Sequence, residues 1–206
     1  MSSQRRSFLV ILIAALLWGG DHFSAQSPVR VRVQTELGDI VVEVDQAKAP
    51  ETAANFLRYV DGGHYDGGMW HRTVKLDNQP ESPVKIEVIQ AGVNPERAKS
   101  GFPPIALERT NKTGLLHKDG TISMARGAPD SATSGWFICI NDQPSLDFGG
   151  ARNPDGQGFA AFGRVVSGMD VVRKIQAAPS STSRASNAEA QRLTPPIKIV
   201  KASRIP

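Results

Sequence analysis

Arg72 is the first residue in this sequence whose neighbours suggest chemistry. It lies in GGMWHRTVK (67–75), where an aromatic ring, an imidazole and a guanidinium follow one another. The apolar and β-branched residues around it indicate a strand, and alternate side chains of a strand point to opposite faces. This alternation predicts that Trp70 and Arg72 share one face, with His71 and Thr73 on the other. Taken alone, the pattern fits an exposed arginine whose stem lies over the tryptophan ring.

Other common catalytic patterns are missing from the sequence. The four histidines lack zinc-ligand spacing, and the single cysteine, Cys139, cannot complete a metal site. No glycine-rich phosphate loop occurs, and NPDGQG (153–158) lacks the bidentate glutamate of a calcium loop. Ser131 and Ser134 are not part of a nucleophile elbow. We therefore expect no metal, no cofactor and neither nucleophilic nor proton-transfer chemistry.

Composition and charge are those of an ordinary globular protein. The chain has 206 residues, of which 40% are hydrophobic and 21% charged, so one domain with appendages is expected. The net charge of +4 is too small to indicate a nucleic-acid partner, and no dense Lys/Arg stripe with aromatics occurs. Cys139 cannot form an internal disulfide, and its context, WFICI, indicates a buried strand. We expect a monomer.

Residues 1–25 have the features of an export signal. A basic start with Arg5 and Arg6 precedes an apolar run, Phe8–Trp18, of about a dozen residues, which is short for a membrane span. The stretch QRRSFLV resembles a twin-arginine signal. Phe23 fits a small-residue cleavage site poorly, so an uncleaved anchor and a buried N-terminal helix stay open as alternatives. The segment predicts a protein exported to the periplasm or cell envelope, or secreted, with membrane contact only through this segment if it is uncleaved.

From residue 28 the hydrophobic periodicity predicts many short strands and two helices. Alternation on both sides of a Gly-Asp turn predicts a hairpin over 29–44, and a period of 3.6 predicts a helix from Pro50 that Gly62 ends. The other expected elements are strands at 69–74, 83–91, 120–125, 136–140 and 159–166, a helix at 168–176, a loop or lid at 141–158, a flexible connection at 177–194 and a closing strand at 196–205. These elements predict that residues 28–206 form a mainly β domain, a closed antiparallel barrel with helices over its open ends.

Three stretches resemble the cyclophilin family of peptidyl-prolyl cis-trans isomerases, most closely its bacterial exported members. They are GGMWHRTV, GTISMARGAPDSATSGWFICIND and GFAAFGRVVSGMDVVRKI, and the likeness extends from about Val29 to Ile205. The resemblance implies an eight-stranded antiparallel barrel capped by two α-helices. It also implies a cofactor-free rotamase that accelerates X–Pro isomerisation in unfolded or extended exported polypeptides and so assists their folding.

This reaction needs none of the catalytic patterns that the sequence lacks. Twisting an X–Pro bond breaks amide resonance and costs about 20 kcal/mol, but it needs neither a proton donor nor a nucleophile. A site can lower the barrier by holding the proline ring in an apolar pocket and by offering a fixed donor where charge develops. The resemblance implies that Arg72 is this donor, in a groove on the outer surface of the barrel, with Trp70 fixing its surroundings.

The resemblance also assigns the other groove residues. Gln90 would steady Arg72 and bind the substrate backbone, and Phe137 would form the floor of the proline pocket, so these three are the implied catalytic residues. The implied substrate-binding residues are Ala125, Arg126, Leu146, Phe159 and Val88.

Several groove positions depart from the family pattern, among them Val88 and Arg126. Glu87, beside Val88, stands where the family has an aromatic wall, so it would place a carboxylate in the groove unless KLDNQPESPVKIEV shifts register. Gly135 replaces a glutamine, and Ser145 replaces an aromatic residue. These departures imply weak binding of cyclosporin-type ligands. They leave open a catalytically weak cyclophilin-like module that binds proline-containing peptides or a partner protein, and, less favoured, a purely structural barrel.

Overall fold

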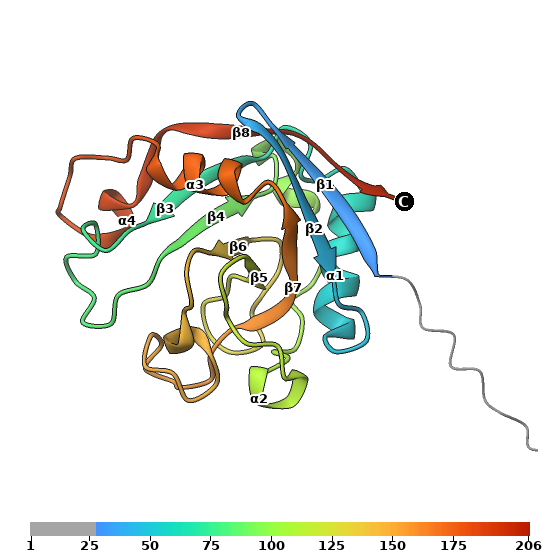
Figure 1. Ribbon diagram of the computed structural model, residues 1–206, viewed down its shortest axis with the longest axis horizontal. Helices are drawn as coiled ribbons and strands as arrows, with labels where there is room; N and C mark the ends of the chain where they lie inside the picture. The colour runs from blue at the N-terminus through green and yellow to red at the C-terminus, as the bar shows by residue number, and fades with distance from the viewer. Residues whose placement is uncertain (1–27) are drawn as a thin grey trace, which may run out of the picture.

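Eight antiparallel strands close into a barrel in the computed structural model, which describes residues 28–206 (Figure 1). The order around the barrel is β1-β2-β7-β5-β6-β4-β3-β8. The strands are β1 (Val29–Thr35), β2 (Gly38–Val44), β3 (Met69–Val74), β4 (Val88–Gly92), β5 (Thr121–Met124), β6 (Trp136–Cys139), β7 (Ala160–Ser167) and β8 (Arg192–Ile205). The predicted eight-stranded antiparallel barrel is therefore confirmed. The predicted export signal, residues 1–25, lies outside the described residues.

The first hairpin shows how sequence alternation builds the barrel wall. Val31 and Val33 of β1 and Ile40 and Val42 of β2 are almost completely buried, whereas the side chains between them are at least partly exposed. The two strands pair residue for residue from Val29–Val44 to Thr35–Gly38. Burying each such aliphatic side chain contributes about 1.5–3 kcal/mol, so this alternation fixes which face of the strand turns inward.

Two longer helices, α1 (Pro50–Asp61) and α3 (Met169–Ala177), pack against different parts of the barrel (Figure 1). Helix α1 buries Phe56 and Leu57, as its period predicts, and the carboxylate of Glu108 accepts hydrogen bonds from its first backbone N–H groups. The one-turn helices are α2 (Thr110–Thr113) and α4 (Asn187–Ala190), and two 3-10 turns lie at Pro95–Ser100 and Pro144–Leu146. Within residues 28–206, no helix has the length and apolar character needed to cross a bilayer.

The predicted face of Trp70 is wrong because β3 contains a bulge. Trp70 pairs with Ala91 and Arg72 with Gln90, so two steps along β3 match one step along β4 and His71 is the additional residue. A bulge of this kind reverses the alternation beyond it. Trp70 is therefore completely buried in the barrel core, whereas Arg72 lies on the outer surface.

Two predicted element boundaries also change. The strand expected at 83–91 begins only at Val88, because the side chain of Gln79 bonds both the N–H and the C=O of Ile86 and so takes the place of a neighbouring strand. The strand expected at 196–205 begins at Arg192, and α4 lies inside the segment 177–194 that was expected to be a flexible connection. Prolines near the start of β8 and small polar residues around α4 interrupt the hydrophobic periodicity, so periodicity does not predict either element.

Candidate functional site

A hollow of about 210 Å³ on the outer barrel surface brings the predicted site residues together. All eight of them line it: Arg72, Val88, Gln90, Ala125, Arg126, Phe137, Leu146 and Phe159. Three further residues complete the lining and were not predicted, namely Ile86, Arg152 and Asn153. We call this hollow the groove.

Neighbouring strands place the central groove residues in one row. Arg72 of β3 pairs with Gln90 of β4, and Gln90 pairs with Phe137 of β6. Residues that are directly opposite in adjacent strands present their side chains on the same face. The bulge at His71 is what turns Arg72 to this outer face, so the row depends on it.

The groove has an apolar floor that is separate from the barrel core. Phe137 packs with Val88 and Leu146 in a small buried cluster, and Phe159 meets the Phe137 ring edge-on with centroids 5.4 Å apart. On its other side, Phe137 stacks on the His117 ring at 6.1 Å. An aromatic ring held from two sides offers a fixed apolar surface of the size of a proline ring.

Two glutamine side chains hold the Arg72 guanidinium in place. Nη1 donates to Oε1 of Gln90 at 2.7 Å, and Nε and Nη2 donate to Oε1 of Gln191 at 2.8 and 2.6 Å. Gln191 is completely buried, and its own amide group donates to the carbonyl oxygen of Asn78. Both partners of Arg72 are neutral, so its positive charge is fixed in position without being cancelled.

The charge of Arg72 persists across neutral pH. Burial, followed by the charge of Arg152, lowers the pKa of Arg72 to about 10, which still leaves it protonated near pH 7. For a peptide without titratable groups, we therefore expect kcat/KM to change by less than about twofold between about pH 6 and pH 9. The measurement is a pH series of exchange rates with circular dichroism as the control for folding. A steep change near neutral pH would indicate proton transfer and contradict this account.

A serine, a histidine and an aspartate lie in line behind the groove. His117 Nδ1 is 2.7 Å from Asp147 Oδ1, and its Nε2 is 3.0 Å from Ser123 Oγ. Ser123 and His117 are fully buried, so this hydroxyl cannot reach a substrate in the groove. The row supports the Phe137 ring, on which His117 stacks. Within residues 28–206, no group of three or more His, Cys, Asp or Glu is placed to hold a metal ion.

Arg126 lines the groove but is engaged in an ion pair. Its guanidinium bonds both carboxylate oxygens of Asp155 at 2.8 and 3.0 Å, and its side chain is only 1% exposed. The hydrogen bond from Arg126 lowers the pKa of Asp155 to about 2, so the pair stays ionised. Arg126 therefore forms part of the groove wall and adds little net charge. Its guanidinium carbon lies over the Phe159 ring, 5.1 Å from the ring centroid.

The comparisons with known proteins agree with this geometry. A family model described as cyclophilin type peptidyl-prolyl cis-trans isomerase/CLD matches residues 30–204. The chain belongs to the cyclophilin family. As a member of this family, it is a peptidyl-prolyl cis-trans isomerase.

Two bacterial relatives and one solved structure illustrate the match. Peptidyl-prolyl cis-trans isomerase cyp18 of Streptomyces antibioticus is 39% identical over 156 residues, covering 75% of this chain and 87% of that protein. Peptidyl-prolyl cis-trans isomerase B of Escherichia coli is 38% identical over 148 residues, covering 71% of this chain and 83% of that protein. A cyclophilin of Cryptosporidium parvum, 21% identical, has the same fold with a TM-score of 0.67 over 87% of this chain and 98% of that one.

Glu87 does not enter the cyclophilin groove, so of the two alternatives left open by the sequence, a groove carboxylate or a shift in register, the structure has the shift. Its carboxylate accepts hydrogen bonds from Asn141 and Gln176, on the side away from the groove lining. Ile86 takes the wall position instead, because the irregular path of residues 83–87 shifts the register there. Of the other departures, Gly135 leaves space beside the Gln90 amide, and Ser145 is not part of the groove lining.

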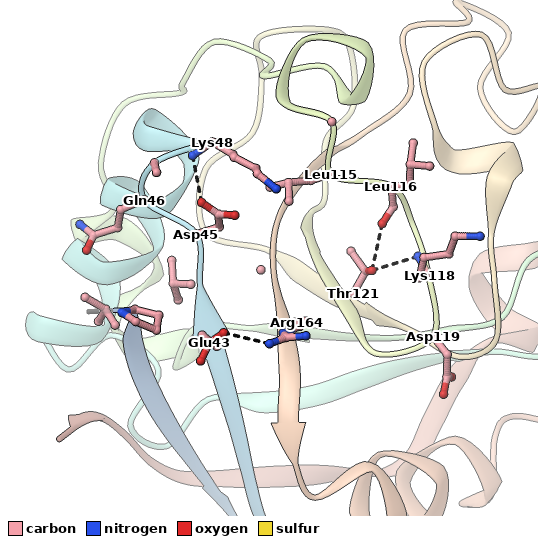
Figure 2. Close-up of a pocket in the computed structure, with 16 residues that line it drawn as sticks. Glu43, Asp45, Gln46, Lys48, Leu115, Leu116, Lys118, Asp119, Thr121 and Arg164 are labelled. Carbon is pink, nitrogen blue, oxygen red and sulfur yellow. Dashed lines mark hydrogen bonds and ion pairs between the residues drawn. The ribbon is translucent and has the colours of Figure 1, made fainter. Parts of the chain in front are cut away.

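A larger hollow of about 900 Å³ lies elsewhere on this cyclophilin, between β2, β7 and residues 114–121 (Figure 2). Several of its charged side chains pair locally: Glu43 accepts from Arg164 at 3.2 Å, and Lys118 bonds Asp142 at 2.7 Å. It contains none of the eight predicted site residues. Size alone does not make it the reactive site, because it lacks a fixed donor facing an apolar floor.

Proposed function

We propose that the groove catalyses the isomerisation of X–Pro bonds in extended polypeptides that leave the cytoplasm. Arg72 would donate to the prolyl nitrogen as amide resonance is lost, since that nitrogen becomes basic only in the twisted state. Phe137, with Val88 and Leu146, would hold the ring, and Gln90 would bind the peptide backbone as well as Arg72. A structural neighbour of this fold is described as being in the presence of the dipeptide Ala-Pro, which supports a proline-containing ligand here.

The position of Arg72 is the observation that carries this proposal. A guanidinium fixed by two neutral amides beside an apolar pocket can stabilise the twisted amide more than either planar form. The direct test is NMR exchange spectroscopy on a short, end-blocked X–Pro peptide with catalytic amounts of residues 28–206. Exchange that is no faster than in buffer would reject the enzyme assignment.

The expected position of Glu87 in the groove was the main reason to consider a catalytically weak protein, and the structure removes that reason. Glu87 points away from the groove, and Ile86 restores an apolar wall at that end. Gly135 still replaces a polar contact to the peptide, so we expect a reduced affinity for short peptides rather than a loss of turnover.

The exported role rests on the first 25 residues, which lie outside the structural description. Their basic start and apolar run support export, and the paired arginines support the twin-arginine route. We expect that Arg5→Lys combined with Arg6→Lys blocks export of the full chain, since that receptor reads the arginine pair. Cell fractionation with an antibody to the folded domain measures the exported fraction of the chain. Unchanged export of the double variant would point to the general secretory route, which accepts lysine.

A further inference from the structure

The groove contains two arginines whose charge is balanced by no carboxylate among residues 28–206. Arg72 bonds only the neutral amides of Gln90 and Gln191. Arg152 donates through Nη1 to the amide oxygen of Gln79 and to the carbonyl oxygen of Val84. Burial and the charge of Arg152 both lower the pKa of Arg72, and burial lowers the pKa of Arg152. Arg126, the third groove arginine, is already paired with Asp155.

Both guanidinium groups keep unused donors. A guanidinium carries five N–H donors. The structure uses only Nη1 of Arg152, so its Nε and Nη2 have no partner within residues 28–206. They are not completely buried, because no Arg152 atom is among the enclosed polar atoms that lack a partner. Arg152 is thus anchored by one nitrogen and offers the rest of its fork at the groove surface.

The strand register places Arg152 at one end of the groove. Gln90 and Phe137 lie opposite each other at its centre. In one direction follow Gly135 and Ala125, which are joined by a backbone hydrogen bond. In the other direction follow Val88 and then Ile86, next to the Val84 carbonyl that Arg152 binds. Arg152 therefore lies where a residue adjacent to the bound proline would extend along the groove.

We propose that Arg152, with the uncancelled charge of Arg72 beside it, forms a subsite for a carboxylate on the residue that flanks the client's proline. The groove then favours X–Pro segments with a neighbouring aspartate or glutamate over those with a neutral residue of the same shape. This inference rests on the proposed function, because it concerns the substrate of the same groove. A charge-assisted, bidentate contact to a guanidinium fork is the chemistry that such a carboxylate supplies.

The test compares end-blocked tetrapeptides that carry glutamate or glutamine immediately before or immediately after the proline. NMR exchange rates give kcat/KM, and titrations give affinity, for the wild-type domain and for Arg152→Gln, Arg152→Lys and Arg164→Gln. Arg164 is a matched arginine on β7, with a side chain 69% exposed, outside the groove. A melting curve for each variant controls for folding.

We expect the wild-type protein to prefer glutamate over glutamine about 5- to 10-fold at one of the two flanking positions, mainly through KM, and less at high salt. Arg152→Gln should bring this ratio to about one, Arg152→Lys should retain part of it, and Arg164→Gln should leave it unchanged. No preference at either position, equal preference at both, or a preference that survives Arg152→Gln would overturn the proposal. If no peptide is isomerised, the proposed function fails, and the ratio of affinities still decides whether the subsite exists.

Discussion

Replacing Arg72 with alanine is expected to lower kcat/KM for X–Pro isomerisation by about two to three orders of magnitude, or about 3–4 kcal/mol. The guanidinium interacts most strongly with the prolyl nitrogen when resonance is lost, so the loss should appear in the rate and much less in peptide affinity. Arg72→Lys should also be poor, because a single ammonium cannot bond Gln90 and Gln191 together as the fork does. Exchange rates and titrations on the same samples measure both quantities.

The control for this prediction is Arg164→Ala, which removes an exposed arginine from β7. It should leave both the exchange rate and the affinity unchanged. Equal rates for the wild-type and Arg72→Ala proteins at saturating protein would contradict the assigned role of Arg72. If both proteins are equally slow and both still bind proline peptides, the groove is a binding module, and the catalytically weak alternative is correct. Loss of the fold in Arg72→Ala would contradict its place at the surface of the groove.

Periodicity and local motifs predicted the parts of this protein that depend on neighbouring residues in the chain. The alternation of Val31, Val33 and Ile40 encodes which side of the hairpin is buried, and the spacing of Phe56 and Leu57 encodes the buried face of α1. The resemblance of three continuous stretches to the cyclophilins was enough to select eight of the eleven residues that line the groove. Local sequence carries this information because strand and helix periods are properties of the backbone itself.

The errors arose where a specific hydrogen-bond partner overrides the local period. The bulge at His71 depends on how β4 and β8 pair with β3, so alternation alone placed Trp70 on the wrong face. Ile86 became a wall residue because Gln79 holds its backbone, which no strand pattern reveals. In both cases the deciding interaction is a hydrogen bond whose partner cannot be identified from the residue types nearby.

Gln191 is the partner of Arg72 that sequence reasoning missed. It lies 119 residues after Arg72, inside a small and polar segment expected to be a flexible connection. The structure instead fixes it by two contacts to β3 and its neighbour: its backbone carbonyl accepts from the N–H of Thr73, and its amide donates to Asn78. The only signal in the sequence was a glutamine directly before the closing strand, which is too common to be informative.

Replacing Gln191 with leucine is therefore expected to lower kcat/KM by about 10- to 30-fold, since two of the three observed bonds to Arg72 disappear and its guanidinium can rotate. Stability should fall by about 1–3 kcal/mol, because the Asn78 carbonyl loses its partner inside the protein. Gln191→Glu keeps an acceptor for Arg72 and should recover the position of the guanidinium while cancelling part of its charge, so we expect an intermediate rate.

The matched control is Gln157→Leu, which removes a glutamine that accepts from Arg109 at 2.6 Å outside the groove. We expect it to change kcat/KM by less than about twofold. The NMR signal of the Arg72 Nε–H distinguishes positioning from simple destabilisation, because a fixed N–H exchanges slowly with water and a rotating one does not. If Gln191→Leu lowers the melting temperature but leaves both kcat/KM and this signal unchanged, Gln191 supports the fold and does not position Arg72.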